Sequence, residues 1–500
     1  NTAVGHAAGN AVTTGINNTL IGGLAGDATT TGSYNSAMGS QALGANTTGS
    51  FNVAVGTVAL SANTTASENT AVGYYSLGNN TTGASNTGFG FYTLAVNTTG
   101  AGNTATGYKA LVSNTTASNN TATGYFALSA NTTGYSQTGI GYLALNSAVS
   151  SNRNVAVGTQ AGRYTTGYYN VFLGAEAGLG ASGNSTGNSN IGIGAQALDA
   201  LTSGSSNVGI GSWTGGSNAA LSSNTSGAKN IAVGSEALGT NTTGSQNVAI
   251  GHGALLANVS SGNNAAVGYH CMLNTTGANN AGFGYRALAN QTSGQSNAAF
   301  GWQSLVSLTD GGYNTAIGQG AGSNVTTGTT SVYVGYAAQA AAASDLETIV
   351  IVADGSGAGR IGKGSSTGFI NPNLGSVYQG NNSASWATTS DERIKKNITD
   401  NTVGLEAINR IRVRNFEYRT QDEIVDFENP AAAVVEKEGV QLGVIAQEIE
   451  KILPSVVHEE STGVKTVNPD NLTWHLVNAV KELSATVETL TARIKELEGE

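Results

Sequence analysis

The chain is poor in charge, proline and cysteine. Its 500 residues include 20 Lys and Arg, 30 Asp and Glu, four prolines and one cysteine. A lone cysteine excludes a disulfide within the chain, so stability must come from packing or oligomerisation. We expect Cys271 to be filler in a repeat rather than a reactive thiol or metal ligand. No run approaches the roughly 18 apolar residues that a membrane span needs, so we expect no membrane insertion.

The few charges are unevenly distributed. Residues 1–387 hold 7 Lys and Arg and 9 Asp and Glu, whereas residues 388–500 hold 13 and 21. Neither part has an excess of positive charge, which excludes a nucleic-acid footprint. Glycine is abundant, at 71 residues, beside very little proline. That composition excludes collagen and Pro-rich disorder and suits short strands joined by tight turns. The chain begins with Asn and lacks a signal peptide, so we expect a fragment whose true start is missing.

A repeat of about 17 residues runs through residues 1–340. The pattern Asn-x-x-x-Gly, with a mostly apolar fourth residue, occurs twenty times, from NTAVG (1–5) to SVYVG (331–335). Glycine fills the fifth place in every copy, and Asn fills the first in all but Gln137 and Ser331. The second and fourth places are mostly β-branched or apolar, and residues two apart share a strand face. We therefore expect these two places to point into a common interior.

The rest of each repeat supplies a second apolar pair, such as Ala110-Leu111, and a polar loop that is typically Asn-Thr-Thr-Gly. We expect this loop to contain the left-handed turn conformation that Asn and Gly tolerate. Seventeen residues cannot bury a core alone, but stacked coils can. The sequence predicts a mainly β fold, a β-roll or β-solenoid of about twenty coils, with a length of roughly 95 Å at ~4.8 Å per coil. Asparagines in the first place would form an amide ladder along it.

These repeats resemble the head domains of trimeric autotransporter adhesins. The resemblance implies a trimeric β-roll shaft or head over residues 1–340. Residues 336–387 break the period, and we interpret 341–387 as a transitional β segment.

Residues 388–500, which hold most of the charge, predict a small α+β domain over 388–475 and a coiled coil over 476–500. Residues 404–419 predict a short helix leading into a strand, and residues 439–457 predict a strand and then a helix that stops near Pro454. Apolar residues at spacings of four and three then form a heptad seam, which consists of Leu476, Val480, Leu483, Val487, Leu490, Ile494 and Leu497. The alternative is one helix packed on its own domain.

The border between the two blocks reads TTSDERIKKNI (388–398). Serine becomes a nucleophile when a base takes its proton, and lysine can be that base when buried. Ser390 and Lys395 are five residues apart, so a turn could bring the amine to the hydroxyl. The alternative is that Ser390 caps a helix whose first turn holds Asp391 and Glu392. Local chemistry alone leaves both interpretations open.

Wider motifs favour the first interpretation. SDERIKKNI (390–398), GVIAQE (443–448), LPSVV (453–457) and VKEL (480–483) together resemble the intramolecular chaperone domain of phage endosialidases, tail spikes and tail fibres, which also occurs in a membrane-bound transcription factor of animals. The resemblance implies that this domain drives homotrimerisation and folding of the upstream β-structure. It further implies self-cleavage between Thr389 and Ser390, with Ser390 as nucleophile and Lys395 as general base.

The function expected from this resemblance is a structural, host- or surface-binding fibre of a virion tail. The alternative is a trimeric adhesin on a bacterial cell surface that carries the same chaperone. No turnover enzyme is expected in the repeats, because the nine acidic residues before residue 388 are scattered and form no evident carboxylate pair. Two of them, Glu176 and Glu236, occupy the same place of the repeat. A glycosidase site shared between chains stays open. The five histidines lack ligand spacing, so no metal or cofactor is expected.

An aromatic rail follows the repeat glycine in five successive coils. The rail consists of Tyr74, Phe91, Tyr108, Tyr125 and Tyr142. Facing outward, it would offer rings to a host cell-surface glycan or protein. Facing a neighbouring chain, it would be trimer core. The sequence does not choose between these.

Overall fold

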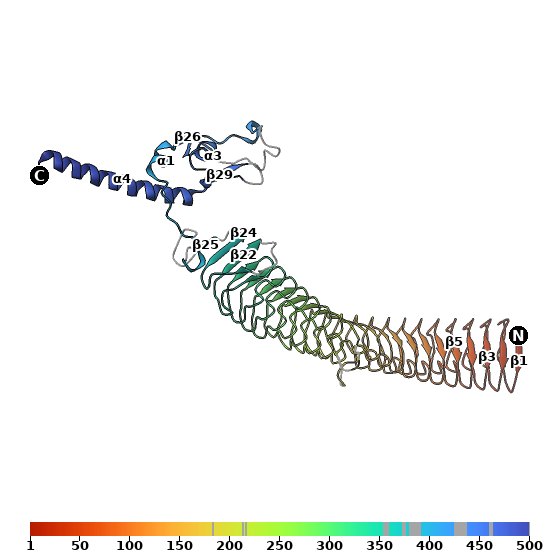
Figure 1. Ribbon diagram of the computed structural model, residues 1–500. Helices are drawn as coiled ribbons and strands as arrows, with labels where there is room; N and C mark the ends of the chain where they lie inside the picture. Colours follow the sequence, from red (N-terminus) through yellow and green to blue (C-terminus); the bar gives the residue numbers. More distant parts are fainter. Residues whose placement is uncertain are drawn as a thin grey trace. The chain divides into compact units, whose positions relative to one another are not determined.

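The computed structural model describes residues 1–182, 185–212, 215, 218–353, 360–372, 377–379, 392–424, 438–459 and 464–499. The chain divides into two compact units, Asn1–Thr389 and Ser390–Glu500. The first unit is a parallel β-solenoid and the second is a small α+β unit that ends in a long helix (Figure 1).

The solenoid places one three-residue strand of each repeat in a single parallel sheet. Each strand pairs with the next at the same repeat place, as in Ala71 opposite Gly88. The twenty strands are β1 (Thr2–Val4), β2 (Thr19–Ile21), β3 (Ser36–Met38), β4 (Val53–Val55), β5 (Thr70–Val72), β6 (Thr87–Phe89), β7 (Thr104–Thr106), β8 (Thr121–Thr123), β9 (Thr138–Ile140), β10 (Val155–Val157), β11 (Val171–Leu173), β12 (Ile191–Ile193), β13 (Val208–Ile210), β14 (Ile231–Val233), β15 (Val248–Ile250), β16 (Ala265–Val267), β17 (Ala281–Phe283), β18 (Ala298–Phe300), β19 (Thr315–Ile317) and β20 (Val332–Val334). The predicted mainly β solenoid is confirmed.

The core is filled by the third place of each repeat, which is the middle residue of its strand, and the expectation that the second and fourth places point inward is wrong. Ala71 is fully buried, whereas Thr70 and Val72 on either side are half-buried. Neighbouring residues of a strand face opposite ways, so only one of the two sets can be inside. The interior of so short a coil also holds the leucine of the second apolar pair, such as Leu60. Alanine and glycine at the third place fit beside it, and two β-branched side chains per coil would not.

The turns of each coil need left-handed backbone at places other than the predicted ones. Lys109, Leu111 and Asn119, at the seventh, ninth and seventeenth places of one coil, have φ of 54°, 50° and 62°. The Asn-Thr-Thr-Gly loop at 97–100 has no residue of positive φ. The fifth-place glycine is needed for another reason as well. At Gly56, φ is 129° and an added Cβ would lie 2.6 Å from the carbonyl oxygen of Gly73 in the next coil.

Two buried asparagine ladders follow the solenoid axis. The predicted ladder occupies the first place: Nδ2 of Asn52 donates to Oδ1 of Asn35 at 3.1 Å. A second ladder uses the asparagine of the Asn-Thr-Thr-Gly loop, where Nδ2 of Asn80 donates to Oδ1 of Asn63 at 3.0 Å and to the carbonyl of Gly83 at 2.8 Å. Each amide thus satisfies a buried polar neighbour, which is the condition for placing it inside.

The solenoid continues beyond the last predicted repeat. Strand β22 (Ile349–Ala353) pairs in parallel with β20, and β24 (Gly368–Pro372) pairs with β22. Val332 lies opposite Ile349, so the 17-residue step is kept across a segment that we expected to break the period. Strand β25 (Val377–Gln379) then adds antiparallel to β24, while β21 (Ala338–Gln339) pairs with β23 (Arg360–Ile361).

The described residues of the second unit form short elements and one long helix around one small core. In chain order they are η1 (Glu392–Ile394), α1 (Leu405–Arg410), β26 (Arg414–Phe416), η2 (Gln421–Glu423), β27 (Gln441–Gly443), α3 (Ala446–Glu450), η3 (Pro454–Val456), β28 (Val457–Glu459), β29 (Lys465–Val467) and α4 (Pro469–Glu498). Strands β26 and β27 pair antiparallel, as do β28 and β29. The predicted helix-to-strand order over 404–419 and strand-to-helix order over 439–457 are confirmed.

Candidate chaperone and cleavage site

The predicted dyad falls at the edge of the described chain. Thr389 and Ser390 lie outside the described residues, so the structure gives no distance from Ser390 to Lys395. Lys395 is described and exposed, directly after the single turn η1, and its backbone N–H donates to the carbonyl of Glu392 at 3.0 Å. In the alternative interpretation Ser390 caps a helix with Asp391 and Glu392 in its first turn. Glu392 begins the three-residue turn η1, whereas Ser390 and Asp391 lie outside the described residues.

The motifs behind the family resemblance form the core of the second unit. Ile449, Leu453 and Val456 are buried together, and Val444 and Val457 pack against them. The guanidinium of Arg414 donates two hydrogen bonds to the carboxylate of Glu448, from Nη2 to Oε1 at 2.7 Å and from Nε to Oε2 at 3.3 Å. This pair joins β26 to α3, and the hydrogen bond from Arg414 lowers the pKa of Glu448. GVIAQE and LPSVV therefore serve packing.

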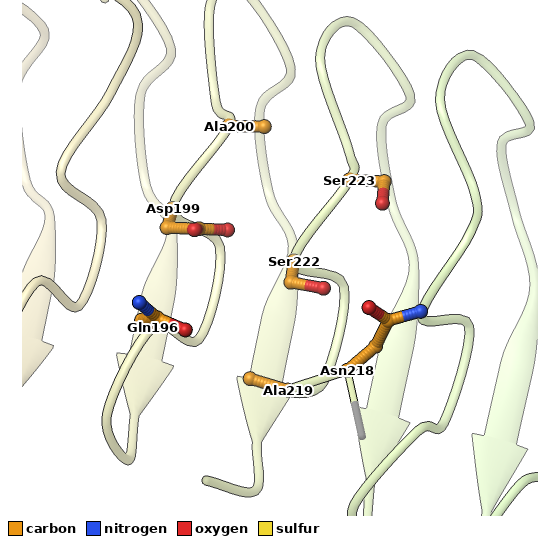
Figure 2. A pocket seen from close by; sticks show the side chains of 7 residues that line it. All are labelled: Gln196, Asp199, Ala200, Asn218, Ala219, Ser222 and Ser223. Carbon is orange, nitrogen blue, oxygen red and sulfur yellow. The ribbon is translucent and has the colours of Figure 1, made fainter. Parts of the chain in front are cut away.

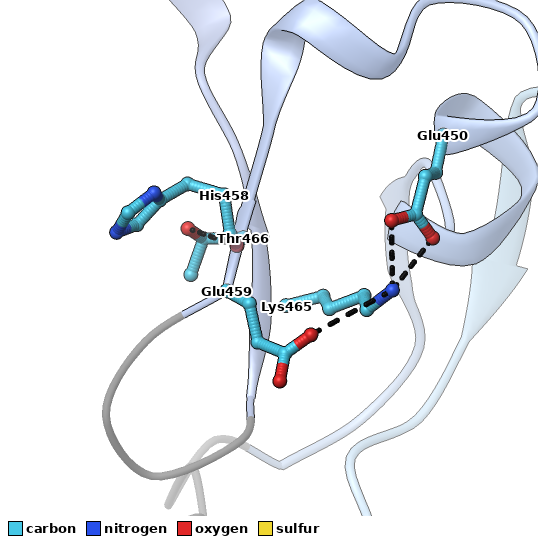
Figure 3. Close-up of polar contacts among 5 residues, drawn as sticks. All are labelled: Glu450, His458, Glu459, Lys465 and Thr466. Carbon is cyan, nitrogen blue, oxygen red and sulfur yellow. Dashed lines mark hydrogen bonds and ion pairs between the residues drawn. The ribbon is translucent and has the colours of Figure 1, made fainter.

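A lysine between two carboxylates fastens the β28–β29 hairpin to α3 (Figure 3). Nζ of Lys465 lies 2.8 and 2.7 Å from the two carboxylate oxygens of Glu450, and 3.8 Å from Oε2 of Glu459. Its hydrogen bond to Glu450 raises the pKa of Lys465. A lysine held in its charged form is a poor general base, so Lys465 is not a candidate for that role.

Helix α4 begins at a well-defined cap and is docked by one of its faces. Oδ1 of Asn468 accepts from the backbone N–H groups of Asp470 and Asn471, and Pro469 occupies the first helical position. Further along, Nδ2 of Asn478 donates to the carbonyl of Asn401 at 2.7 Å, and Oε2 of Glu482 accepts from the N–H of Leu405 at 2.7 Å. These contacts hold the start of α1 against α4.

The heptad seam lies on a different face of α4, and that face is uncovered. All seven seam residues, Leu476 to Leu497, are 50–76% exposed. Their side chains project roughly 100° or more around the helix from Asn478, which faces the domain. The alternative of one helix packed on its own domain holds for the first part of α4, which contacts α1, while the coiled coil of the exposed seam stays a prediction.

One comparison with known proteins identifies this region. Residues 390–458 match the Peptidase_S74 family model, described as chaperone of endosialidase. The chain thus carries an endosialidase-type chaperone domain at its C-terminal end, behind a β-solenoid of stacked repeats. The match begins at the residue where the second compact unit begins.

The aromatic rail is exposed in the single chain. Tyr74, Phe91, Tyr108, Tyr125 and Tyr142 are 38–48% exposed. Successive rings stack on one another, with centroids 5.2–5.6 Å apart. Because each ring face is covered by the next ring, the rail presents ring edges outward. The three inner rings, Phe91, Tyr108 and Tyr125, therefore offer a sugar no open face for stacking.

A second rail of the same kind escaped the sequence analysis. His252, Tyr269, Tyr285 and Trp302 also follow the repeat glycine, and each stacks on the next at 5.4, 5.5 and 6.1 Å. Extending the rule that found the first rail to later coils would have found this one. Both rails occupy the sixth place of the repeat, directly after the glycine. The coils that lie between the two rails carry small residues at this place.

Other predicted candidates have structural roles. Cys271 is fully buried in the solenoid core, and burial raises the pKa of its thiol to about 12, so it is filler as predicted. Oε2 of Glu236 lies 3.9 Å from Nε2 of His252, and Oε2 of Glu176 accepts from Nε2 of Gln196 at 2.8 Å. Among the described residues, no group of three His, Cys, Asp or Glu could hold a metal ion. No described helix is long and apolar enough to cross a membrane.

Proposed function

We propose that this protein is a homotrimeric fibre whose C-terminal domain directs assembly of the solenoid and then cleaves itself off between Thr389 and Ser390. The observation that carries the proposal is the chaperone match starting at residue 390, at the boundary of the second unit. A chaperone is needed because stacked strands expose aggregation-prone edges until the chains are in register.

The cleavage step assigns one role to each residue of the dyad. The hydroxyl of Ser390 attacks the carbonyl carbon of Thr389 while Lys395 takes the hydroxyl proton. The C–N bond breaks as the backbone nitrogen of Ser390 takes the proton back from Lys395 and becomes a free amine. Thr389 is then joined to the side-chain oxygen of Ser390 as an ester, which water hydrolyses. Lysine acts as a base where burial favours its neutral amine. Because Lys395 is exposed in the single chain, we place its burial at a contact between chains, so that cleavage follows assembly.

Two uncovered surfaces support contact between copies. One is the heptad seam of α4. The other is the outer face of the solenoid sheet, formed by the second and fourth places, where none of the twenty repeats carries a charged residue. Ile231 and Ile250, for example, are 41% and 40% exposed on this face. A copy of the same chain is the partner whose surface repeats with the same period over the same length.

Intact-mass measurement of four proteins tests the cleavage. The parent chain is expected to release a fragment that begins with Ser390 without added protease. Ser390→Ala and Lys395→Ala are expected to stay full-length. Lys395→Arg is also expected to fail, because a guanidinium does not give up a proton near neutral pH. Cutting of Ser390→Ala at the same bond would show that the assignment is wrong.

The location and host partner follow as part of the same proposal. An extracellular phage tail fibre is the setting in which we place this domain arrangement, and a host cell-surface glycan or protein is the expected target. A bacterial surface adhesin that carries the same chaperone is the competing setting. Immunogold labelling of purified virions with an antibody against the solenoid separates the two, since labelled tails support the first and labelled cell surfaces the second.

A further inference from the structure

A polar groove crosses two coils of the solenoid at Asp199 (Figure 2). Its volume is about 360 Å³, at the lower end of the range of small-ligand pockets. One coil contributes Gln196, Asp199 and Ala200, and the next contributes Asn218, Ala219, Ser222 and Ser223. In Figure 2 the side chain of Asp199 extends toward the coil that carries Ser222.

The carboxyl group of Asp199 is held in an environment that costs stability. Burial raises the pKa of Asp199 to about 6, and the carboxylate of Glu176 in the preceding coil adds to the shift. Gln196 donates through Nε2 to Oε2 of Glu176 at 2.8 Å and so fixes that neighbour in place. None of the described groove residues is a Lys, Arg or His that could neutralise Asp199. A carboxyl kept at such a cost in a groove is a typical mark of a ligand site.

The groove is a special version of a feature that the repeat makes possible. Only two of the twenty repeats have aspartate at the tenth place, Asp27 and Asp199. A smaller groove of about 310 Å³ lies at Asp27. Its lining also includes the polar residues Gln41 and Ser61 and three residues without polar side chains, a leucine, a glycine and an alanine. At Asp199 the corresponding surface carries five polar side chains. The repeat thus provides the hollow, and the residues of coils twelve and thirteen give it its polarity.

We infer that the Asp199 groove binds a neutral saccharide segment. Carboxyl, amide and hydroxyl groups line it together, and this combination can both donate to and accept from sugar hydroxyls. Anionic ligands are disfavoured by the two carboxyl groups and the lack of a cation in the described lining, and apolar ligands by the loss of hydrogen bonds to the polar side chains of the lining. The inference deepens the proposed surface-binding function and rests on it.

Saturation-transfer difference NMR on the full chain tests the inference, with short neutral oligosaccharides of hexose and N-acetylhexosamine units as probes. At least one probe is expected to bind the parent protein. Asp199→Asn and Ser222→Ala are each expected to weaken that binding about tenfold, as loss of one hydrogen bond to the ligand does; the Ser222 hydroxyl, which also donates to the carbonyl of Gly239, would serve there as an acceptor. Glu236→Gln, a matched loss of an acid on the solenoid outside the groove, is expected to leave it unchanged.

Two results would overturn the inference. One is that no neutral oligosaccharide binds, and the other is that Asp199→Asn binds as the parent does. Cleavage and trimer mass are measured on the same samples. If they are normal while the saccharide result is negative, the groove assignment fails and the proposed chaperone function stands. If the parent protein does not form trimers, the proposed assembly fails independently of the groove.

Discussion

Oδ1 of Asn52 accepts a hydrogen bond from the backbone N–H of Asn69 at 3.0 Å, although 17 residues separate them. The same contact recurs in neighbouring coils, where the side chain of a first-place asparagine accepts a hydrogen bond from a backbone N–H of the following coil. The ladder therefore sets the register of the stack as well as filling its interior. Removing one amide leaves buried polar groups of two coils without partners.

Asn86→Ala is accordingly expected to loosen the stack locally. Asn86 accepts from the N–H of Asn103 at 2.9 Å and donates to the carbonyl of Gly100 at 2.9 Å. We expect a loss of about 1–3 kcal/mol in the free energy of local opening, measured by amide hydrogen exchange in these coils. Asn290→Ala, at an exposed turn position, is the control and is expected to change exchange little. Equal effects of the two would argue against the ladder.

Leu111→Ile tests the left-handed backbone. Leu111 is fully buried with φ of 50°, a conformation that β-branched side chains resist. The change keeps volume and apolarity, so we expect the added cost, about 1–3 kcal/mol, to come from the backbone. Leu20→Ile, at the buried centre of strand β2, is the control, where β-branching is tolerated and the cost is expected to stay under about 1.5 kcal/mol. Thermal unfolding of both variants compares them, and a larger loss at Leu20 would contradict the prediction.

Asp199→Asn is expected to stabilise the solenoid at neutral pH. The folded pKa of about 6 lies above the unfolded value near 3.9, so the folded state binds more protons between these pH values. Stability of the parent protein contributed by this group is then present below about pH 4 and lost as pH rises to about 6. Allowing for solvent screening, we expect a gain of about 1 kcal/mol at pH 7.5 and none at pH 4. Melting temperatures at the two pH values check this, and an equal gain at both would exclude a charge effect.

Ile250→Glu is expected to disrupt association of the solenoids. The side chain lies on the outer sheet face, where burial against another chain would leave the new carboxylate unpaired. Thr243→Glu, on an exposed polar turn of the same solenoid, is the matched control. Native mass spectrometry of the cleaved shafts is expected to show trimers for the control and dissociated chains for Ile250→Glu. Intact trimers in both would move the interface to another face.

The double variant Leu483→Asp with Leu490→Asp is expected to abolish both trimerisation and cleavage, because both exposed seam positions would carry charge. Ala485→Asp with Ala492→Asp adds the same charges to exposed positions of α4 away from the seam. That control is expected to assemble and cleave. Light scattering and intact mass measure the two outcomes, and cleavage of a monomeric seam variant would show that the site forms within one chain.

Much of the solenoid could be predicted because repetition itself is informative. A step of 17 residues with glycine at a fixed place predicts parallel strands in register, and buried amides at a fixed place predict a ladder. The chaperone motif GVIAQE located α3, the pattern of residues 404–419 located α1, and the heptad spacing located the seam of α4. The inward face of the strands was not predictable in the same way, since Thr70 and Val72 look more core-like than Ala71 does. Hydrophobicity ranks side chains, but the width of the coil decides which ones fit.

Two further features also depended on the fold. Leu111 carries no local signal for positive φ, because the left-handed turn is forced by closing a coil around a buried side chain. The continuation of the stack through Ile349 was hidden because Thr348 takes the place of the usual asparagine. Residues 349–353 form a strand of the stack because they pair with β20, and this pairing depends on the neighbouring coil rather than on the residues of the strand alone.

The sequence by itself determined that this chain is a stack of coils followed by a charged chaperone domain, because periodicity and motif spacing survive in one dimension. Only the tertiary structure decided which surfaces are open. The aromatic rings cover one another's faces because coils of equal length bring equal places together. Asp199, Gln196 and Ser222 share a groove for the same reason, since residues far apart along the chain become neighbours once each coil has closed on the one before.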